Sequence, residues 1–200
     1  MTLNEFFKEN PKTALAFSGG VDSSYLLYAA MQAGAEVRAY YVKTAFQPEF
    51  EYEDAMRLAK QLGAEVTVLR PDALCDPQVA ANPANRCYYC KQNIFGSIWR
   101  AARADGFYVL LDGTNASDQA DDRPGMKALR ELKVRSPLRE AGLTKAMIRE
   151  KSRLAGLFTW DKPAYACLAT RIPTGETITE EKLTRTEWAE SYLMGLGFSD

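Results

Sequence analysis

The chain has 200 residues, of which 46% are hydrophobic and 26% charged, and its formal net charge is −1. This composition predicts a folded protein with one core and excludes a disordered chain. The near-neutral charge balance removes the bulk attraction that drives nucleic-acid binding, so RNA is disfavoured as a partner. No apolar run reaches membrane-spanning length, and the first residues lack a signal-peptide pattern. We therefore expect no membrane partner and a cytoplasmic location.

Short β-branched or aromatic segments alternate with longer amphipathic segments along the chain. This alternation is typical of an α/β fold in which a parallel, twisted, Rossmann-like sheet carries helices on both faces. The four segments predicted as buried strands are Thr13–Phe17, Val37–Val42, Val66–Leu69 and Tyr108–Leu111.

The helices and the loop that follow define the expected domain organisation. Apolar residues at helical spacing predict a crossover helix that ends at Gly63, and similar spacing predicts a helix that begins after Thr179. Between them, the Pro-containing stretch 161–175 predicts a linker or a functional loop. We expect a main domain at residues 1–160 and a smaller C-terminal region at residues 161–200.

The sharpest motif is SGGVDSS at positions 18–24, directly after the first predicted strand and before a predicted helix at positions 22–33. Glycines let the backbone approach a phosphate closely, and the start of a helix directs free amide groups at an anion. The motif is not a GxxxxGK[ST] P-loop, because the spacing differs and no lysine follows the second glycine. An ordinary Ser-Gly-Gly turn is the alternative.

The motif resembles the SGGxDS loop of the PP-loop, or N-type, ATP pyrophosphatases. In that superfamily the loop binds the pyrophosphate that leaves when ATP adenylates a substrate. The resemblance implies that Asp22 arranges Mg²⁺. The residues to which it assigns contacts with the ATP phosphates are Ser18, Gly19, Gly20, Asp22 and Ser23.

The chain has four cysteines and no histidine. In a reducing compartment such cysteines are more often ligands or catalysts than disulfides. Cys87 and Cys90, together with the distant Cys167, can hold three irons of a 4Fe–4S cluster and leave the fourth iron open for a sulfide. Zinc is the second candidate, although it needs Cys75 or a carboxylate as fourth ligand. A redox couple is disfavoured because the CxxC follows a loop and does not open a helix directly from a strand; thiols without a function are a further alternative.

Six segments resemble, in the same order, those of the LarE family of ATP-dependent sulfurtransferases. The segments are SGGVDSS, NRCYYCK, DGTNASDQADDRPG, VRSPLREAGLTKAMIR, WDKPAYACLATRIPTG and ITEEKL, and together they span nearly the whole chain. The resemblance implies that ATP and Mg²⁺ adenylate a carboxylate of pyridinium-3,5-biscarboxylic acid mononucleotide, after which sulfur replaces AMP to give a thiocarboxylate. The product leads to the nickel-pincer nucleotide of lactate racemase. A homo-oligomer and a hand-off to nickel-inserting and carboxylating enzymes are also implied.

The resemblance places Cys167 at the sulfur-bearing position. In some family members this cysteine is sacrificed and becomes dehydroalanine, whereas other members carry a CxxC as well and are thought to bind an iron–sulfur cluster. Because this chain also has Cys87 and Cys90, we interpret it as the cluster-bearing type, with the sacrificial mechanism as the variant to exclude.

Other residues are assigned to the site by their position or by the resemblance. Gly113 and Thr114, in the segment 112–115, follow the fourth predicted strand, at whose carboxyl end ligands of open α/β sheets bind. Arg171 is expected to bind a phosphate or carboxylate in a forked geometry, unless it is an ordinary surface charge. The residues that resemble a family segment near the reacting carboxylate, with a solvated acidic turn as the alternative, are Asp118, Asp121 and Arg123.

The chain departs from the family pattern in two ways. Asp122, Thr170 and Thr174 stand where other residue types are usual, which affects the expected substrate contacts. Family members also continue into a further basic segment, so we expect the C-terminal region to be cut short.

Two other enzyme classes share part of these motifs. A PP-loop tRNA thiolase has the same ATP chemistry and a cysteine trio, but it should carry a basic face or an RNA-binding appendage, which the charge balance does not indicate. An ammonia-using nucleotide synthetase shares SGGVDSS and needs no cysteine trio. A nucleotide-binding module without turnover is the third alternative, and it would leave Asp22 and the thiols without a role.

Overall fold

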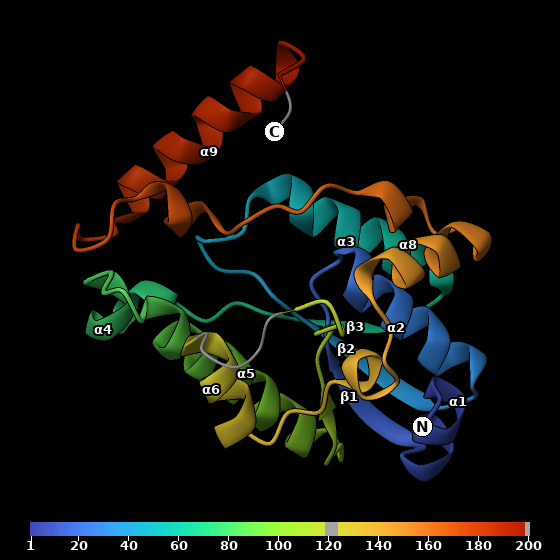
Figure 1. The fold of residues 1–200 in the computed structure, drawn as a ribbon. Helices are drawn as coiled ribbons and strands as arrows, with labels where there is room; N and C mark the ends of the chain where they lie inside the picture. Colours follow the sequence, from blue (N-terminus) through green and yellow to red (C-terminus); the bar gives the residue numbers. More distant parts are fainter. Residues whose placement is uncertain (119–123, 199–200) are drawn as a thin grey trace.

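The computed structural model describes residues 1–118 and 124–198, and a four-stranded parallel sheet lies at its centre (Figure 1). The strand order is β3-β2-β1-β4, and Ala14 of β1 pairs with Arg38 of β2 and with Leu110 of β4. All four predicted strands are confirmed; β3 has the predicted bounds, and the other three differ from them at one or both ends. Their bounds are Lys12–Ala16 for β1, Glu36–Val42 for β2, Val66–Leu69 for β3 and Leu110–Leu111 for β4.

Helices cover both faces of the sheet, because successive strand residues point to opposite sides. Leu15 and Tyr41 pack against α1, α2, α3, α7 and α8, whereas Ala14 and Tyr40 pack against α5 and α6. The predicted α/β fold class is confirmed. The helix bounds are Leu3–Glu9 (α1), Val21–Gln32 (α2), Glu49–Leu62 (α3), Pro77–Ala80 (α4), Arg86–Ala104 (α5), Pro124–Glu131 (α6), Pro137–Glu140 (α7), Lys145–Leu154 (α8) and Glu180–Gly195 (α9), with 3-10 turns at Ala73–Cys75, Phe158–Asp161 and Leu168–Arg171.

Both predicted helix boundaries are confirmed. Gly63 caps α3 in the left-handed conformation, with φ of 66°, which a glycine adopts without strain. Thr179 is the N-cap of α9, and its hydroxyl accepts a hydrogen bond from the amide of Lys182. Among the described helices, none is long and apolar enough to cross a membrane.

A third apolar cluster lies beyond the carboxyl ends of the strands. It joins Phe46 and Val79 to Leu168 and Ile172 of the Pro-containing stretch. The stretch 161–175 is therefore packed against the main domain, which favours the predicted functional loop over a linker. The division of the chain at residue 160 stays a prediction.

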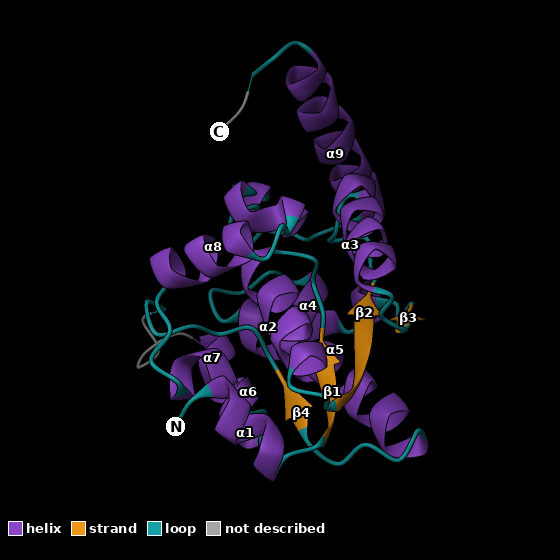
Figure 2. Cartoon of the chain, turned by 90° about the vertical axis from the view of Figure 1, so that its right-hand side faces the viewer, coloured by secondary structure: helices purple, strands orange, loops and turns teal. Residues whose placement is uncertain are grey.

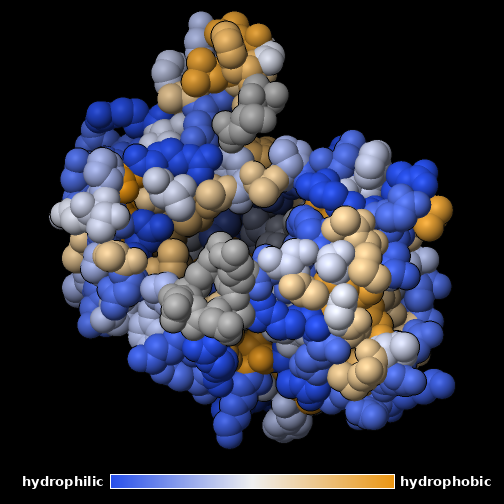
Figure 3. All heavy atoms as spheres, in the orientation of Figure 1, coloured by the Kyte–Doolittle hydropathy of each residue, from blue (hydrophilic) through white to orange (hydrophobic). Residues whose placement is uncertain are grey.

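Helix α9 extends away from the sheet beyond this cluster (Figure 2). Leu183 is its buried residue, whereas Trp188, Tyr192 and Leu193 are exposed. Apolar side chains of this helix gather at the top of the molecule in Figure 3.

Candidate functional site

The loop between β1 and α2 is held by hydrogen bonds between Ser18 and Ser23. Ser23 Oγ accepts a hydrogen bond from the Ser18 amide at 3.2 Å and lies 3.0 Å from Ser18 Oγ. Gly20 is the N-cap of α2 and has no side chain that could cap the first amide groups. These amides, and the positive end of the helix dipole, are therefore available to an anion. The local geometry fits a phosphate-binding loop.

Gly19 lies at the back of this loop, with φ of 73°. A Cβ atom here would stand 2.6 Å from Cβ of Ala55 and 2.8 Å from its Cα, on α3. The phosphate contact predicted for Gly19 stays a prediction, and its evident contribution is the close approach of the loop to α3.

Gly19→Ala is expected to lower the free energy of unfolding by about 2–4 kcal/mol, because it combines a left-handed backbone with a clash against backbone atoms. Gly34 is the matched control, since its φ is 74° and no atom lies within 4 Å of the position of a Cβ. Gly34→Ala is expected to cost only about 1 kcal/mol. Urea unfolding of both variants measures the difference, and equal losses would contradict the packing role.

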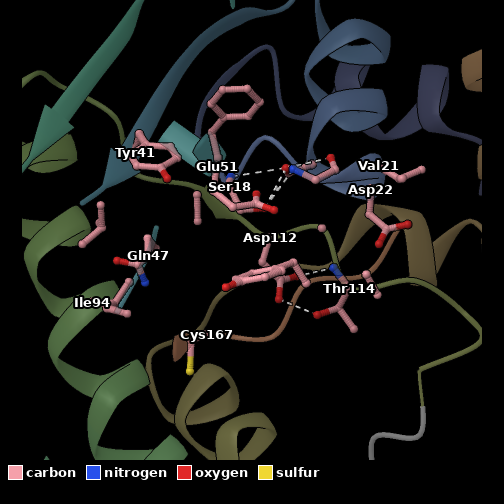
Figure 4. A pocket seen from close by; sticks show the side chains of 18 of the residues that line it. Ser18, Val21, Asp22, Tyr41, Gln47, Glu51, Ile94, Asp112, Thr114 and Cys167 are labelled. Carbon is pink, nitrogen blue, oxygen red and sulfur yellow. Dashed lines mark hydrogen bonds between the residues drawn. The ribbon is translucent and has the colours of Figure 1, made fainter. Parts of the chain in front are cut away.

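A cavity of about 520 Å³ lies where the strands end, next to this loop. Ser18, Gly20, Asp22 and Ser23 line it, and so does Cys167 of the 161–175 loop. Figure 4 shows Ser18 and Cys167 on opposite sides of the space, with Gln47 and Ile94 along one flank and Asp112 and Thr114 along the other. The phosphate loop and the predicted sulfur-bearing residue therefore share one cavity.

Asp22 presents its two carboxylate oxygens to different surroundings. Oδ2 accepts a hydrogen bond from Lys145 Nζ at 2.8 Å, whereas Oδ1 is buried and has no hydrogen-bond partner among the described residues. A buried oxygen without a partner costs free energy unless a ligand satisfies it. Mg²⁺ prefers carboxylate oxygens and phosphates as ligands, so Asp22 fits the predicted role of holding Mg²⁺ beside the ATP phosphates.

The segment after β4 forms a tight turn at the edge of the cavity. Asp112 is buried and accepts hydrogen bonds from Thr114 Oγ1 at 2.5 Å and from Ser136 Oγ at 2.6 Å. Gly113 lies against the phosphate loop, because a Cβ here would stand 2.9 Å from the Ser23 amide nitrogen. Asp112, Gly113 and Thr114 line the cavity, as expected for a nucleotide site. Their contacts with a nucleotide stay predictions.

Of the three residues predicted to lie near the reacting carboxylate, the structure describes one. Asp118 lines the cavity, and its Oδ2 accepts a hydrogen bond from the Asn115 amide at 2.9 Å. Asp121 and Arg123 lie outside the residues that the structure describes.

Two lysines that the sequence analysis did not single out also line the cavity. Lys145 belongs to α8 and stands 123 positions after its partner Asp22. Lys162 forms ion pairs with Glu51 at 3.1 Å and with Asp54 at 2.9 Å on α3, and thereby ties the start of the sulfur-bearing loop to the main domain. Both lysines lie within quoted motifs, LTKAMIR and WDKPAYAC. Only the fold brings them to the cavity.

Arg171 binds a carboxylate of its own chain. Its Nε donates to Glu190 of α9 at 2.6 Å, and its guanidinium lies 4.7 Å from the ring centre of Tyr165. Tyr165 OH is also hydrogen-bonded to Glu190. The expected contact of Arg171 with a substrate phosphate or carboxylate stays a prediction, since this residue is not among those that line the cavity.

Cys87 and Cys90 lie at the start of α5, and α5 follows a loop, as expected. Cys87 is exposed, whereas Cys90 and Cys167 are half-buried against the third apolar cluster. Burial raises the pKa of Cys90 to about 12, and the nearby Cys167 and Cys87 thiols add to the effect. Burial also raises the pKa of Cys167, although the positive charge of Arg86 acts in the opposite direction. Cys90 and Cys167, from two segments far apart in the sequence, thus pack against the same apolar cluster, and Cys87 is near enough to influence the pKa of both.

Cys75 differs from these three thiols. It is exposed, and its Sγ donates a hydrogen bond to Asp72 Oδ2 at 2.9 Å, which raises the pKa of Cys75. Within residues 1–118 and 124–198, no group of three or more Cys, Asp or Glu side chains is arranged to hold a metal ion.

In the metal-free protein, Cys90 is expected to react with iodoacetamide at pH 8 at least about a hundredfold more slowly than an unperturbed thiol, because the thiolate is the reactive form. A raised pKa keeps the thiol protonated, so its reactivity should still be rising well above pH 8. Peptide mass spectrometry at several pH values measures the rate, with the urea-unfolded chain as reference. Equal rates in the folded and unfolded chain would contradict the buried position.

Comparisons with known proteins place this site in a family. No protein-family model matches the chain. An uncharacterised protein from Synechocystis is 40% identical over 98% of this chain and 74% of its own length. The pyridinium-3,5-bisthiocarboxylic acid mononucleotide synthase from Lactiplantibacillus plantarum is 34% identical over 98% of this chain and 72% of its own length.

Two further matches are more distant. A tRNA-specific 2-thiouridylase from Thermotoga petrophila is 26% identical over 60% of this chain and 40% of its own length. The NMN synthetase from Francisella tularensis superposes with a TM-score of 0.67 at 15% identity, covering 94% of this chain and 83% of the synthetase. The fold is therefore that of the PP-loop enzymes. Because it is 34% identical to the mononucleotide synthase over 98% of its own residues, the chain belongs to the LarE family of ATP-dependent sulfurtransferases.

Proposed function

We propose that the protein adenylates a carboxylate of pyridinium-3,5-biscarboxylic acid mononucleotide with ATP and then replaces AMP with sulfur to give a thiocarboxylate. The observation that carries the proposal is the cavity that Asp22 of the phosphate loop and Cys167 line together. The relative from Lactiplantibacillus plantarum, named for the bisthiocarboxylic product, supports this choice of substrate.

The first half of the reaction uses the phosphate loop. The amide groups at the start of α2 and the hydroxyls of Ser18 and Ser23 would hold the β- and γ-phosphates of ATP, with Lys145 supplying further positive charge. Mg²⁺, when bound to Asp22, would neutralise charge on the leaving pyrophosphate. A substrate carboxylate oxygen attacks the α-phosphorus, the bond to pyrophosphate breaks, and a mixed anhydride with AMP forms.

The second half takes place on the Cys167 side of the cavity. A sulfur nucleophile attacks the acyl carbon of the anhydride, and AMP leaves with the electron pair of the broken C–O bond. An activated carbon held next to Cys167 would meet the sulfur nucleophile at a high local concentration, which favours sulfur transfer over hydrolysis. The position of Cys167 on the cavity wall supports its role in delivering sulfur.

We further propose that Cys87, Cys90 and Cys167 hold a 4Fe–4S cluster, which when bound would supply the sulfide from its fourth iron. The convergence of the three thiols supports this donor set. A four-iron cluster holds each thiolate on a different iron, so three cysteines suffice and the fourth iron stays open for a sulfide. Zinc would need Cys75 or a carboxylate as its fourth ligand, and Cys75 is exposed and hydrogen-bonded to Asp72. The number of thiols therefore favours the cluster over zinc.

The family resemblance also supports a homo-oligomer that receives its substrate from a carboxylating enzyme and passes its product towards a nickel-inserting enzyme. The tRNA thiolase and the ammonia-using synthetase remain the alternatives that the test of function separates.

The test measures AMP and pyrophosphate formation from ATP in the presence of the pyridinium mononucleotide, of tRNA, or of ammonia with a nucleotide acceptor. We expect both products to form with the pyridinium mononucleotide and to stay at background with the other two. Activity that depends on tRNA at physiological salt, or on ammonia, would replace the proposed substrate with that alternative.

A further inference from the structure

Asn82, four residues before α5 begins at Arg86, is hydrogen-bonded to the loop that follows Cys167. Asn82 is 2% exposed and adopts a left-handed conformation, with φ of 52°. Its Nδ2 donates to the carbonyl oxygens of Ile172 at 3.2 Å and Pro173 at 2.8 Å. Its own carbonyl oxygen accepts a hydrogen bond from the Gly175 amide at 2.9 Å. A buried side chain with this many directed hydrogen bonds fixes the position of the segment that it contacts.

Arg86 extends this connection to the cysteines themselves. It is 8% exposed, it is the first residue of α5, and it immediately precedes Cys87. Its Nη1 donates to Asn82 Oδ1 at 2.6 Å and to the carbonyl oxygen of Ala169 at 2.9 Å. Ala169 stands two residues after Cys167. One guanidinium nitrogen therefore joins the start of the CxxC helix to the turn that carries Cys167.

The turn that carries Cys167 makes a second backbone contact, but that contact does not connect it to α5. The Leu168 amide donates to the Phe46 carbonyl oxygen at 3.0 Å, which ties the turn to the segment after β2 and not to α5. Burying an arginine is costly unless its donors are satisfied. The hydrogen bonds to Asn82 and Ala169 satisfy the buried Arg86 at the point where the two cysteine-bearing segments meet.

We infer that Asn82 and Arg86 are positioning residues that hold the Cys167 turn against the CxxC helix and thereby set the separation of Cys167 and Cys90. The inference rests on the proposed function in one respect: the reason for holding the thiols at this separation would be sulfur delivery by the three thiols together. The hydrogen-bonded connection itself does not depend on the substrate.

The test measures the separation directly. In a Cys75→Ser, Cys87→Ser background, a short bifunctional thiol reagent can join only Cys90 and Cys167. Mass spectrometry gives the final yield of the cross-link, after the slow reaction of the half-buried Cys90 has gone to completion. Asn82→Gly removes the side chain but tolerates the positive φ, and Arg86→Gln removes the guanidinium. We expect either change to lower the yield about fivefold, because the local concentration of one thiol near the other falls.

Two further variants separate positioning from other effects. Arg86→Lys keeps one charged donor group, so we expect an intermediate yield. Arg100→Gln changes an exposed arginine of the same helix and should leave the yield unchanged. In the chain with all four cysteines, Asn82→Gly and Arg86→Gln should lower thiocarboxylate formation while pyrophosphate release stays within about twofold of the wild type.

An unchanged cross-link yield in both Asn82→Gly and Arg86→Gln would overturn the inference, as would the absence of a cross-link in the background protein. A parallel loss of cross-linking, pyrophosphate release and thermal stability would also overturn it, because the residues would then support the fold as a whole. Failure of the proposed function has a different signature, in which the cross-link depends on Asn82 and Arg86 but the pyridinium mononucleotide never elicits pyrophosphate release.

Discussion

Cys167→Ala is expected to abolish thiocarboxylate formation while leaving substrate-dependent pyrophosphate release within about threefold of the wild-type rate. The reason is that the two half-reactions use opposite sides of the cavity. Cys167 stands on the side opposite the phosphate loop, so its thiol is needed for the attack on the acyl carbon and not for the attack on the α-phosphorus. The measurement follows both products in one reaction, with pyrophosphate by a coupled assay and the thiocarboxylate by mass spectrometry.

Cys75→Ala is the matched control for this prediction. Cys75 is exposed and hydrogen-bonded to Asp72, and it is not among the residues that line the cavity. Its loss should leave both products unchanged. Thiocarboxylate formation by Cys167→Ala at the wild-type rate would contradict the assignment of sulfur delivery to Cys167.

Asp22→Asn is expected to lower pyrophosphate release by about a hundredfold or more, since the variant keeps the shape of the side chain and removes its charge. The buried Oδ1 of Asp22 is the oxygen that fits Mg²⁺, and its Oδ2 orients Lys145 at 2.8 Å. A neutral amide is a weaker ligand for Mg²⁺ and a weaker partner for Lys145. Rates measured across a series of Mg²⁺ concentrations should show a raised requirement for the metal.

The control for this change is Asp105→Asn. Asp105 also forms an ion pair, with Arg38 at 3.1 Å, and accepts a hydrogen bond from Tyr40 OH at 2.7 Å. It is not among the residues that line the cavity. Its replacement should change pyrophosphate release by less than about twofold. If Asp22→Asn retained the wild-type rate and Mg²⁺ requirement, the role of Asp22 in holding the metal would be wrong.

The features that the sequence predicted are those encoded over short distances along the chain. The strand at positions 13–17, the glycine turn and helix α2 are contiguous, so their residue types specify both the local structure and the phosphate loop. Gly63 and Thr179 were identified as helix ends for the same reason, because a cap depends on neighbouring backbone groups.

The features that the sequence did not predict depend on contacts between distant segments. No local pattern joins Lys145 to Asp22, 123 positions away, or Lys162 to Glu51. The sequence likewise suggested Arg171 as a ligand-binding residue, whereas the structure pairs its guanidinium with Glu190 of α9. Such pairs follow from the packing of α3, α8 and α9, which motif spacing does not specify.

The most direct test is the mass of the nucleotide product after anaerobic incubation of the cluster-reconstituted protein with sulfide, ATP, Mg²⁺ and pyridinium-3,5-biscarboxylic acid mononucleotide. We expect exchange of a carboxylate oxygen for sulfur, together with one AMP for each sulfur gained. Formation of AMP without a sulfur-containing product, or no AMP at all, would contradict the joining of ATP activation and sulfur transfer in this cavity.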